Sequence, residues 1–165
     1  MKKLIFLFLF LSFLVALFFS FFSFNKIAGT AMEPSLKSGT NALFWKWGHN
    51  PKRGDIVLYT PKDQTKQDNP NVFMMDYIGR VVGLPTESVR IENGNLYIDN
   101  NVEKYRVEEE YLSPDTKTKA YEEGKWFKIG EFEYLILTDK RESIINIPLR
   151  ITYRDNIKGT LLYKF

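Results

Sequence analysis

The sequence predicts a mostly β domain behind one N-terminal transmembrane helix, with the strands in two packed sheets or a partly closed β-barrel. Two observations support this fold class. Residues 4–24 form an unbroken apolar run, "LIFLFLFLSFLVALFFSFFSF", with no charge and no proline. Over residues 25–165, short apolar runs alternate with Gly, Pro, Asn and Asp, which is typical of strands joined by turns.

The apolar run is long enough to cross a membrane. Its 21 residues would give a helix of about 31 Å, close to the thickness of a bilayer's hydrocarbon core. Two lysines precede the run and favour a cytoplasmic N-terminus by the positive-inside rule. We therefore expect a cytoplasmic tip over residues 1–3, a transmembrane anchor over 4–24 and an extracytoplasmic β domain over 25–165.

The same N-terminus also allows a second interpretation, a cleavable secretory signal. Gly29 and Ala31 are small residues at the spacing of a cleavage site after Ala31. The apolar region of such a signal spans about 7–15 residues, which is shorter than this run. A retained anchor is therefore the favoured interpretation.

Five segments of the body carry strand signals. The segments rich in β-branched and aromatic residues are 55–60, 77–84, 132–138 and 159–165. Residues 88–99 predict a hairpin, because apolar residues alternate on both sides of Asn93-Gly94, a favoured two-residue turn. The charged stretch between residues 99 and 130 is expected to be a solvated connection with one short helix, and residues 60–71 a polar loop.

Composition excludes several classes of site. The chain has no cysteine, so it has no disulfide, thiolate nucleophile or cysteine metal site. Apart from the two N-terminal lysines, 21 basic residues face 20 acidic ones, which argues against a nucleic-acid partner. The sequence also lacks a Gly-rich phosphate loop and paired His or Asp at ligand spacing. We expect no metal and no cofactor.

Four motifs occur in order: "GTAMEPSLKSG", "KRGDIVLYTP", "YIGRVVGLPTESVRIENGNLYIDN" and "YLILTDKRE", with a final "NIKG". With the anchor in front, this chain resembles the signal peptidase I family, membrane proteases that trim signal peptides from exported preproteins. The resemblance implies a mostly β fold at the cell membrane, with the site near the outer surface. It also implies signal peptides and the lipid bilayer as partners, and allows secretion machinery or an active signal peptidase as others.

Members of this family use a Ser-Lys dyad. The serine directly precedes Met in "S-M-x-P-[TS]-L", and the lysine directly precedes Arg in "K-R-V-[VI]-G-L-P". The matching positions here are Ala31 and Gly79. A methyl group cannot form an acyl-enzyme, and a glycine has no side chain to accept a proton. Loss of such residues leaves about 10³–10⁴-fold acceleration in serine hydrolases, so we expect no significant proteolysis by the family mechanism.

Substitute catalytic residues are not expected. Ser35 is interpreted as making a structural hydrogen bond within its loop. Thr30 adjoins the nucleophile position but would point elsewhere from an extended backbone, where successive side chains alternate. His49 lies in a loop, whereas the family's Ser-His variants place histidine at the lysine position. No replacement dyad follows from the sequence.

The last family motif has also diverged. Members carry "G-D-N-R-x-N-S-x-D-S-R", whose polar side chains support the lysine and the local backbone. This chain reads "TDKRESIINIP": it keeps Asp139 and Arg141 as supporting residues, but residues 146–148 are Asn-Ile-Pro. Divergence here, together with loss of both dyad members, favours a natural non-catalytic relative over a single engineered change at Ala31.

A groove that binds peptides could be retained after loss of the dyad. A peptide that binds as an added strand depends mainly on backbone groups of the protein. The residues expected at this groove are Gly29, Thr30, Met32, Pro34, Ile78 and Val81. For Ile78 and Val81, core packing is an equal alternative. In "ALFWKWG", we interpret Phe44, Trp45 and Trp47 as a membrane-dipping patch, with an apolar strand as the alternative.

Three hypotheses for function remain. The preferred one is a non-catalytic signal peptidase I relative that recognises signal peptides at the outer membrane face. The second is an active signal peptidase, either mutated in this sequence or using another residue. The third is a membrane-tethered scaffold without a peptide groove.

Overall fold

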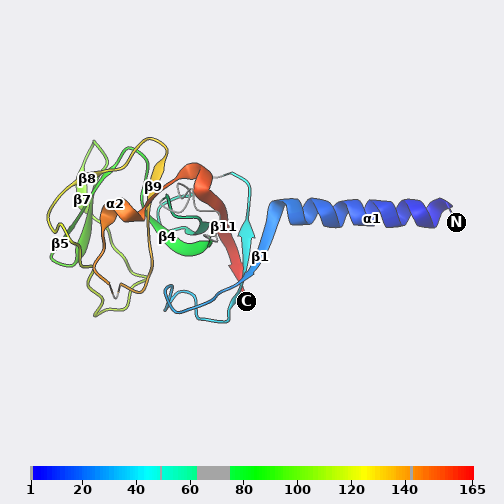
Figure 1. Cartoon of the computed structure of the whole chain (residues 1–165), viewed down its shortest axis with the longest axis horizontal. Helices are drawn as coiled ribbons and strands as arrows, with labels where there is room; N and C mark the ends of the chain where they lie inside the picture. Colours follow the sequence, from blue (N-terminus) through cyan, green and yellow to red (C-terminus); the bar gives the residue numbers. More distant parts are fainter. Residues whose placement is uncertain (1, 49, 63–74, 142) are drawn as a thin grey trace.

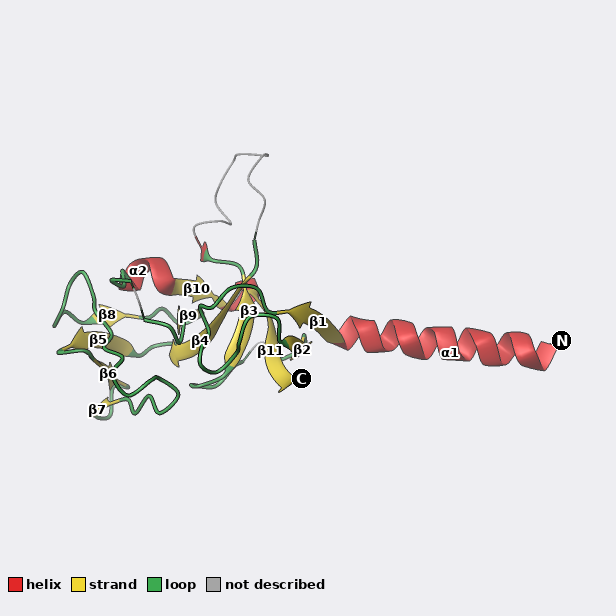
Figure 2. Ribbon diagram, turned by 90° about the horizontal axis from the view of Figure 1, so that it is seen from below, coloured by secondary structure: helices red, strands yellow, loops and turns green. Residues whose placement is uncertain are grey.

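The computed structural model describes residues 2–48, 50–62, 75–141 and 143–165. Its body consists of a seven-stranded and a four-stranded antiparallel sheet. Helix α1 (Lys2–Phe21) projects from the body, and the smaller sheet lies at the end remote from it (Figures 1 and 2). The predicted fold class of two sheets behind one apolar helix is confirmed, and neither sheet closes into a barrel among the described residues.

The seven-stranded sheet contains most of the motifs found in the sequence. Its order is β1 (Phe22–Lys26), β2 (Asn41–Trp45), β11 (Ile157–Lys164), β3 (Ile56–Tyr59), β4 (Tyr77–Gly83), β9 (Glu133–Leu137) and β10 (Ile151–Tyr153). The order in the smaller sheet is β7 (Lys104–Arg106), β6 (Asn95–Asp99), β5 (Ser88–Glu92) and β8 (Phe127–Lys128). Every segment predicted as a strand therefore contains one.

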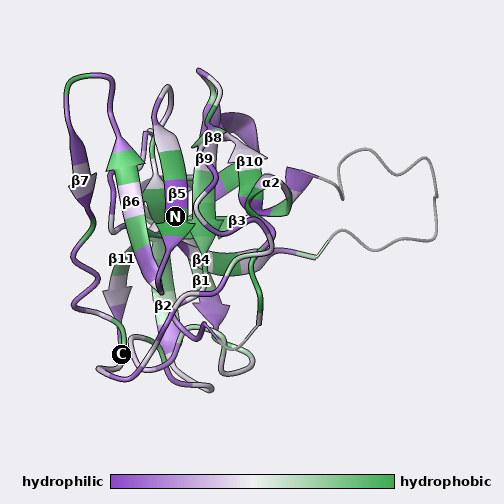
Figure 3. Ribbon diagram, turned by 90° about the vertical axis from the view of Figure 1, so that its left-hand side faces the viewer, coloured by the Kyte–Doolittle hydropathy of each residue, from purple (hydrophilic) through white to green (hydrophobic). Residues whose placement is uncertain are grey.

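The predicted hairpin has the expected turn and register. Asn93 and Gly94 have φ of 51° and 81°, as a tight two-residue turn between twisted strands requires. The pairing places Ile91 opposite Leu96, and both side chains are fully buried. Figure 3, which looks onto the smaller sheet, shows hydrophobic residues in β5 and β6. Their side chains form a core with Val82 of β4 that joins the two sheets.

The prediction of a short helix between residues 99 and 130 is wrong. That segment instead contains β7, β8 and turns, because its backbone bonds to the hairpin. The Val107 N–H donates to the Leu96 carbonyl at 2.9 Å, and the Gly124 N–H to the Ile91 carbonyl at 2.8 Å. A helix occurs later, as α2 (Ile147–Arg150), with a proline in its first turn. The loop expected over residues 60–71 lies largely outside the described residues.

The helix α1 ends at Phe21, three residues before the apolar run does. Residues 22–24 were expected to be helical, but they begin β1 and pair with β2. Lys46, just after β2, binds the free carbonyls at the helix end: its N–H donates to Phe21 at 2.8 Å and its ammonium to Phe19 at 2.9 Å. No side chain of α1 is buried, and the helix is long and apolar enough to cross a membrane.

The aromatic residues of "ALFWKWG" divide between core and surface. Phe44 is completely buried, so including it in a membrane-dipping patch was wrong. Side chains alternate along β2, which turns Phe44 inward and Trp45 outward. Trp45 and Trp47 are exposed and their rings lie 5.7 and 5.2 Å from that of Phe21, at the end of the apolar helix. A membrane role for the two tryptophans stays a prediction.

This division predicts different costs for two phenylalanine truncations. Phe44→Ala should lower the free energy of unfolding by about 3–5 kcal/mol, because it empties a buried site. Phe132→Ala is the control, because Phe132 is 57% exposed and should cost less than about 1 kcal/mol. Urea unfolding of the full chain in detergent, followed by tryptophan fluorescence, measures both. Equal costs would contradict the burial of Phe44.

Candidate functional site

The loop that carries Ala31 leaves β1 and returns in β2. It is closed at its base by two hydrogen bonds, from the Ile27 N–H to the Thr40 carbonyl and from the Gly39 N–H to the Ile27 carbonyl, both 2.8 Å. Gly39 has a φ of 87°, which favours glycine at this turn. The motif therefore folds as a closed loop with Ala31 exposed on it.

Two kinds of contact hold this loop against the sheet. Met32 and Leu36 are buried in a core with Phe44, Leu58 and other residues of the larger sheet. The Lys140 N–H, just after β9, donates to the Ala31 carbonyl at 2.9 Å. Ala31 is therefore tied directly to the last sequence motif.

A cleft of about 340 Å³ opens between this loop and the ends of β3 and β4. It is lined by Asn25, Lys26, Ile27, Ala28, Ala31, Met32, Leu58, Tyr59, Asp76, Tyr77, Ile78, Thr138 and Arg150. The structure thus brings together three residues singled out in the sequence, namely Ala31, Met32 and Ile78. The lining is mainly apolar, with Lys26 and Arg150 as its basic residues.

The other expected groove residues lie elsewhere. Val81 does not line the cleft, because it is fully buried in a core with Val57 and Ile136. This agrees with the alternative interpretation, in which Val81 packs in the core. Gly29 and Thr30 are exposed on the loop beside the cleft. Pro34 lines a separate surface hollow with Lys37 and Lys140.

The predicted position of the general base has no space for a side chain. Gly79 is buried within β4, opposite Val57 of β3. A Cβ atom there would lie 2.5 Å from Ile136 Cγ2, 3.2 Å from Tyr59 Cε1 and 3.3 Å from the Leu137 carbonyl oxygen. Contacts this short force the neighbouring groups to move. The place where a lysine stem would start is therefore filled by Ile136 and Tyr59.

Beside Gly79, Arg80 joins all four sequence motifs. Its guanidinium forms a two-pronged ion pair with the buried Asp139, with Nε 2.8 Å from Oδ1 and Nη2 2.6 Å from Oδ2. The same group donates to the Ser35 hydroxyl at 2.9 Å and to the Gly54 carbonyl at 2.7 Å. The pair connects the nucleophile loop, the start of β3, and strands β4 and β9.

A second buried pair extends this network. Arg141 Nη2 lies 2.7 Å from Glu109 Oε1, and Arg141 Nη1 donates to the Thr118 hydroxyl at 3.0 Å. The Tyr111 hydroxyl donates to the same Glu109 oxygen at 2.6 Å, while Arg80 lies 4.0 Å over the Tyr111 ring. Burial, and then the negative charge of Glu109, raise the pKa of Tyr111, so it stays a protonated donor.

Sequence reasoning singled out Asp139 and Arg141 but missed their partners. Glu109 and Tyr111 lie about thirty residues from Arg141 along the chain, in a segment interpreted as a solvated connection. A charged stretch with no apolar period gives no sign that one of its carboxylates is buried. Only the fold brings these residues together.

The structure does not support Ser35 or Thr30 as a substitute nucleophile. The Ser35 hydroxyl accepts a hydrogen bond from Arg80, so its role is structural, although the partner is a distant side chain and not its own loop. The Lys140 ammonium lies 3.4 Å from the Thr30 hydroxyl in an exposed pair. A lysine base needs an apolar, desolvated setting, which this pair lacks. His49 lies outside the described residues.

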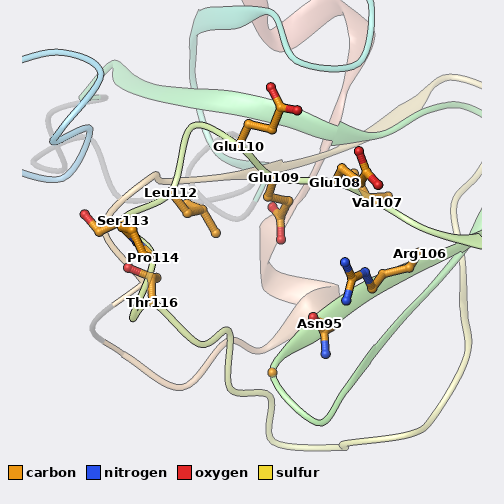
Figure 4. Close-up of a pocket in the computed structure, with 11 residues that line it drawn as sticks. Asn95, Arg106, Val107, Glu108, Glu109, Glu110, Leu112, Ser113, Pro114 and Thr116 are labelled. Atoms are coloured by element: carbon orange, nitrogen blue, oxygen red, sulfur yellow. The ribbon is translucent and has the colours of Figure 1, made fainter.

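A larger hollow of about 430 Å³ lies away from Ala31, along the segment that follows β7 (Figure 4). Its lining includes Glu108, Glu109 and Glu110, together with Arg106 and Asn95. The Glu109 carboxylate is engaged by Arg141 and the Tyr111 hydroxyl. The hollow is an open acidic surface, and we place the candidate site at the smaller cleft.

Comparison with known proteins identifies the family. The model for "Signal peptidase, peptidase S26" matches residues 1–143. The chain therefore belongs to the signal peptidase family, peptidase S26. Together with the apolar helix α1, this membership indicates a membrane location.

Several relatives share this similarity. A probable signal peptidase I-2 of Synechocystis is 32% identical over 120 residues, covering 71% of this chain and 50% of that protein. Signal peptidase I of Leptolyngbya laminosa is 30% identical, covering 84% of this chain and 66% of that protein. The chain thus spans between half and two thirds of these two relatives. A crystal structure of signal peptidase I from Enterococcus faecalis matches with a TM-score of 0.45 and 19% identity, covering 68% of this chain and 97% of that one.

Removing one partner of the Arg80–Asp139 pair should be costly. Asp139→Asn keeps the shape of the side chain but leaves Arg80 without its counter-charge, and should lower the free energy of unfolding by about 3–5 kcal/mol. Glu122→Gln is the matched control, because its pair with Lys125 is exposed and should cost about 0.5 kcal/mol or less. Urea unfolding of the full chain in detergent compares them, and similar losses would contradict a central role for the buried pair.

Proposed function

We propose that this protein recognises signal peptides of exported preproteins at the outer face of a membrane without cutting them. The observation that supports this most directly is the cleft beside Ala31, which keeps an apolar lining while the base position is packed shut. Residues 1–3 are then cytoplasmic, the anchor begins at residue 4, and the β body is extracytoplasmic.

The size and lining of the cleft support peptide binding. A volume of about 340 Å³ is at the lower end of the range of about 300–1,000 Å³ for ligand pockets. Its apolar walls include Ala28, Met32, Leu58 and Ile78. Such a cleft suits the small side chains at the end of a signal peptide, while extended backbone supplies hydrogen bonds that need no particular side chain.

The absence of a dyad supports binding without hydrolysis. Ala31 presents a methyl group at the nucleophile position, and Gly79 has Ile136 and Tyr59 packed against it. A buried lysine would have to displace those side chains. Cleavage by a Ser-Lys dyad would thus require a rearranged core in addition to two substitutions. This requirement supports natural loss of the dyad.

A binding experiment tests this function. The full chain in lipid nanodiscs is titrated with a fluorescent signal peptide that spans an Ala-x-Ala site, and products are sought by mass spectrometry. We expect saturable binding, no cleavage, and at least tenfold weaker binding of a Leu-x-Leu peptide. Cleavage would establish an active peptidase instead, and no binding would favour a scaffold.

Filling the cleft should weaken this binding. Ala31→Leu adds bulk on an exposed turn that lines the cleft, so it should weaken peptide binding at least tenfold with little effect on the fold. Ala16→Leu is the matched control, because Ala16 lies in α1, outside the cleft. Unchanged binding by Ala31→Leu would place the peptide elsewhere.

Restoring the dyad residues alone should not restore cleavage. In Ala31→Ser/Gly79→Lys the lysine stem would collide with Ile136 and Tyr59, and such overpacking costs about 1–3 kcal/mol before the buried charge is counted. We expect no cut preprotein by mass spectrometry and a lower urea midpoint, whereas Ala31→Ser alone should unfold like the parent chain. Cleavage at the Ala-x-Ala site by the double variant would contradict the steric closure at Gly79.

A further inference from the structure

We propose that the cleft beside Ala31 holds the free carboxylate end of a peptide already cut after a small residue, with the Tyr59 hydroxyl and the Arg150 guanidinium as its partners. The ligand class is therefore a cleaved signal peptide in preference to an uncut preprotein. This inference rests on the proposed binding of signal peptides, and specifies which form of the peptide is held.

Tyr59 offers a hydrogen-bond donor in the cleft. The residue is 5% exposed and lines the cleft, and its ring fills the space beside Gly79. Its hydroxyl forms no hydrogen bond within the described part of the chain, and it is not among the buried unpaired polar atoms there, so it is accessible to solvent. Burial raises the pKa of Tyr59, so the hydroxyl keeps its proton at neutral pH. The group is therefore available to donate to a ligand.

Charge in the cleft favours an anion. Arg150, at the end of α2, lines the cleft and forms no ion pair among the described residues. Arg150 and Tyr59 both line this cleft, and the charge of Arg150 lowers the pKa of Tyr59, in opposition to burial. Lys26 adds a second positive charge. Asp76 is the acidic residue in the lining, and its Oδ1 atom lies 2.6 Å from Nζ of Lys158. The positive charge of Lys158 offsets the negative charge of Asp76.

The nucleophile loop supplies one more donor. Ala31 lines the cleft, and its backbone N–H donates no hydrogen bond within the described residues. An uncut peptide presents a neutral carbonyl here, whereas a cut peptide presents a carboxylate with two acceptor oxygens. Hydrogen bonds to an ionised acceptor are about twice as strong as those between neutral groups. Neutral and cationic donors in an apolar cleft therefore favour the cut form.

The test compares two peptides that differ only at the C-terminus. A signal peptide ending in Ala-x-Ala is made as the free acid and as the amide, and each is titrated into the full chain in nanodiscs. We expect the acid to bind roughly tenfold more tightly than the amide. Tyr59→Phe and Arg150→Gln should each reduce this preference at least threefold. Tyr97→Phe and Arg106→Gln, in the smaller sheet, are matched controls that should retain it.

The outcomes separate this inference from the proposed function. Equal binding of acid and amide would overturn the inference and leave signal-peptide recognition intact, whereas binding of neither peptide would overturn both. A preference for the acid that survives both Tyr59→Phe and Arg150→Gln would overturn the assignment of these two partners. Because Arg150 is exposed, its substitution provides a test even if Tyr59→Phe disturbs the core.

Discussion

The buried ion pair between Arg80 and Asp139 is the interaction on which the arrangement of the site depends. Its oxygens and nitrogens approach to 2.6–2.8 Å in the interior, and the remaining guanidinium donors reach Ser35 and Gly54. Burial of two charges is tolerated only when partners satisfy them fully. Four segments far apart in the sequence must therefore meet in one geometry, which sets the Ala31 loop beside β4 and β9.

Gly79, the predicted position of the general base, has core side chains packed against it. A lysine can act as a base only when an apolar pocket favours its neutral form. The pocket is formed by residues other than the lysine itself. Around Gly79 the core is tightly packed, with Ile136 and Tyr59 against the glycine. Tyr59 also lines the cleft. The packing that leaves no space for a lysine thus involves the same tyrosine that we propose as a donor to the ligand.

The connection to the helix determines where the cleft lies. Helix α1 passes into β1 without an intervening loop, and Lys46 binds carbonyls at its C-terminal end. The residues that follow, from Asn25 to Ala28, line the cleft. The distance between the end of the helix and the cleft is therefore set by one short strand. A cleft this close to the apolar helix is what the proposed recognition of signal peptides at a membrane requires.

The sequence by itself determined the apolar helix, the strands and the 93–94 turn, because these follow from local hydrophobic pattern and turn chemistry. It also singled out Ala31 and Gly79 as the predicted dyad positions, because short motifs contain those positions. Only the tertiary structure decided that Glu109 and Tyr111 support Arg141 and Arg80, that Phe44 and Val81 belong to the core, and that the helix ends at Phe21. Each of these depends on contacts between residues distant along the chain, or on which face of a strand is covered.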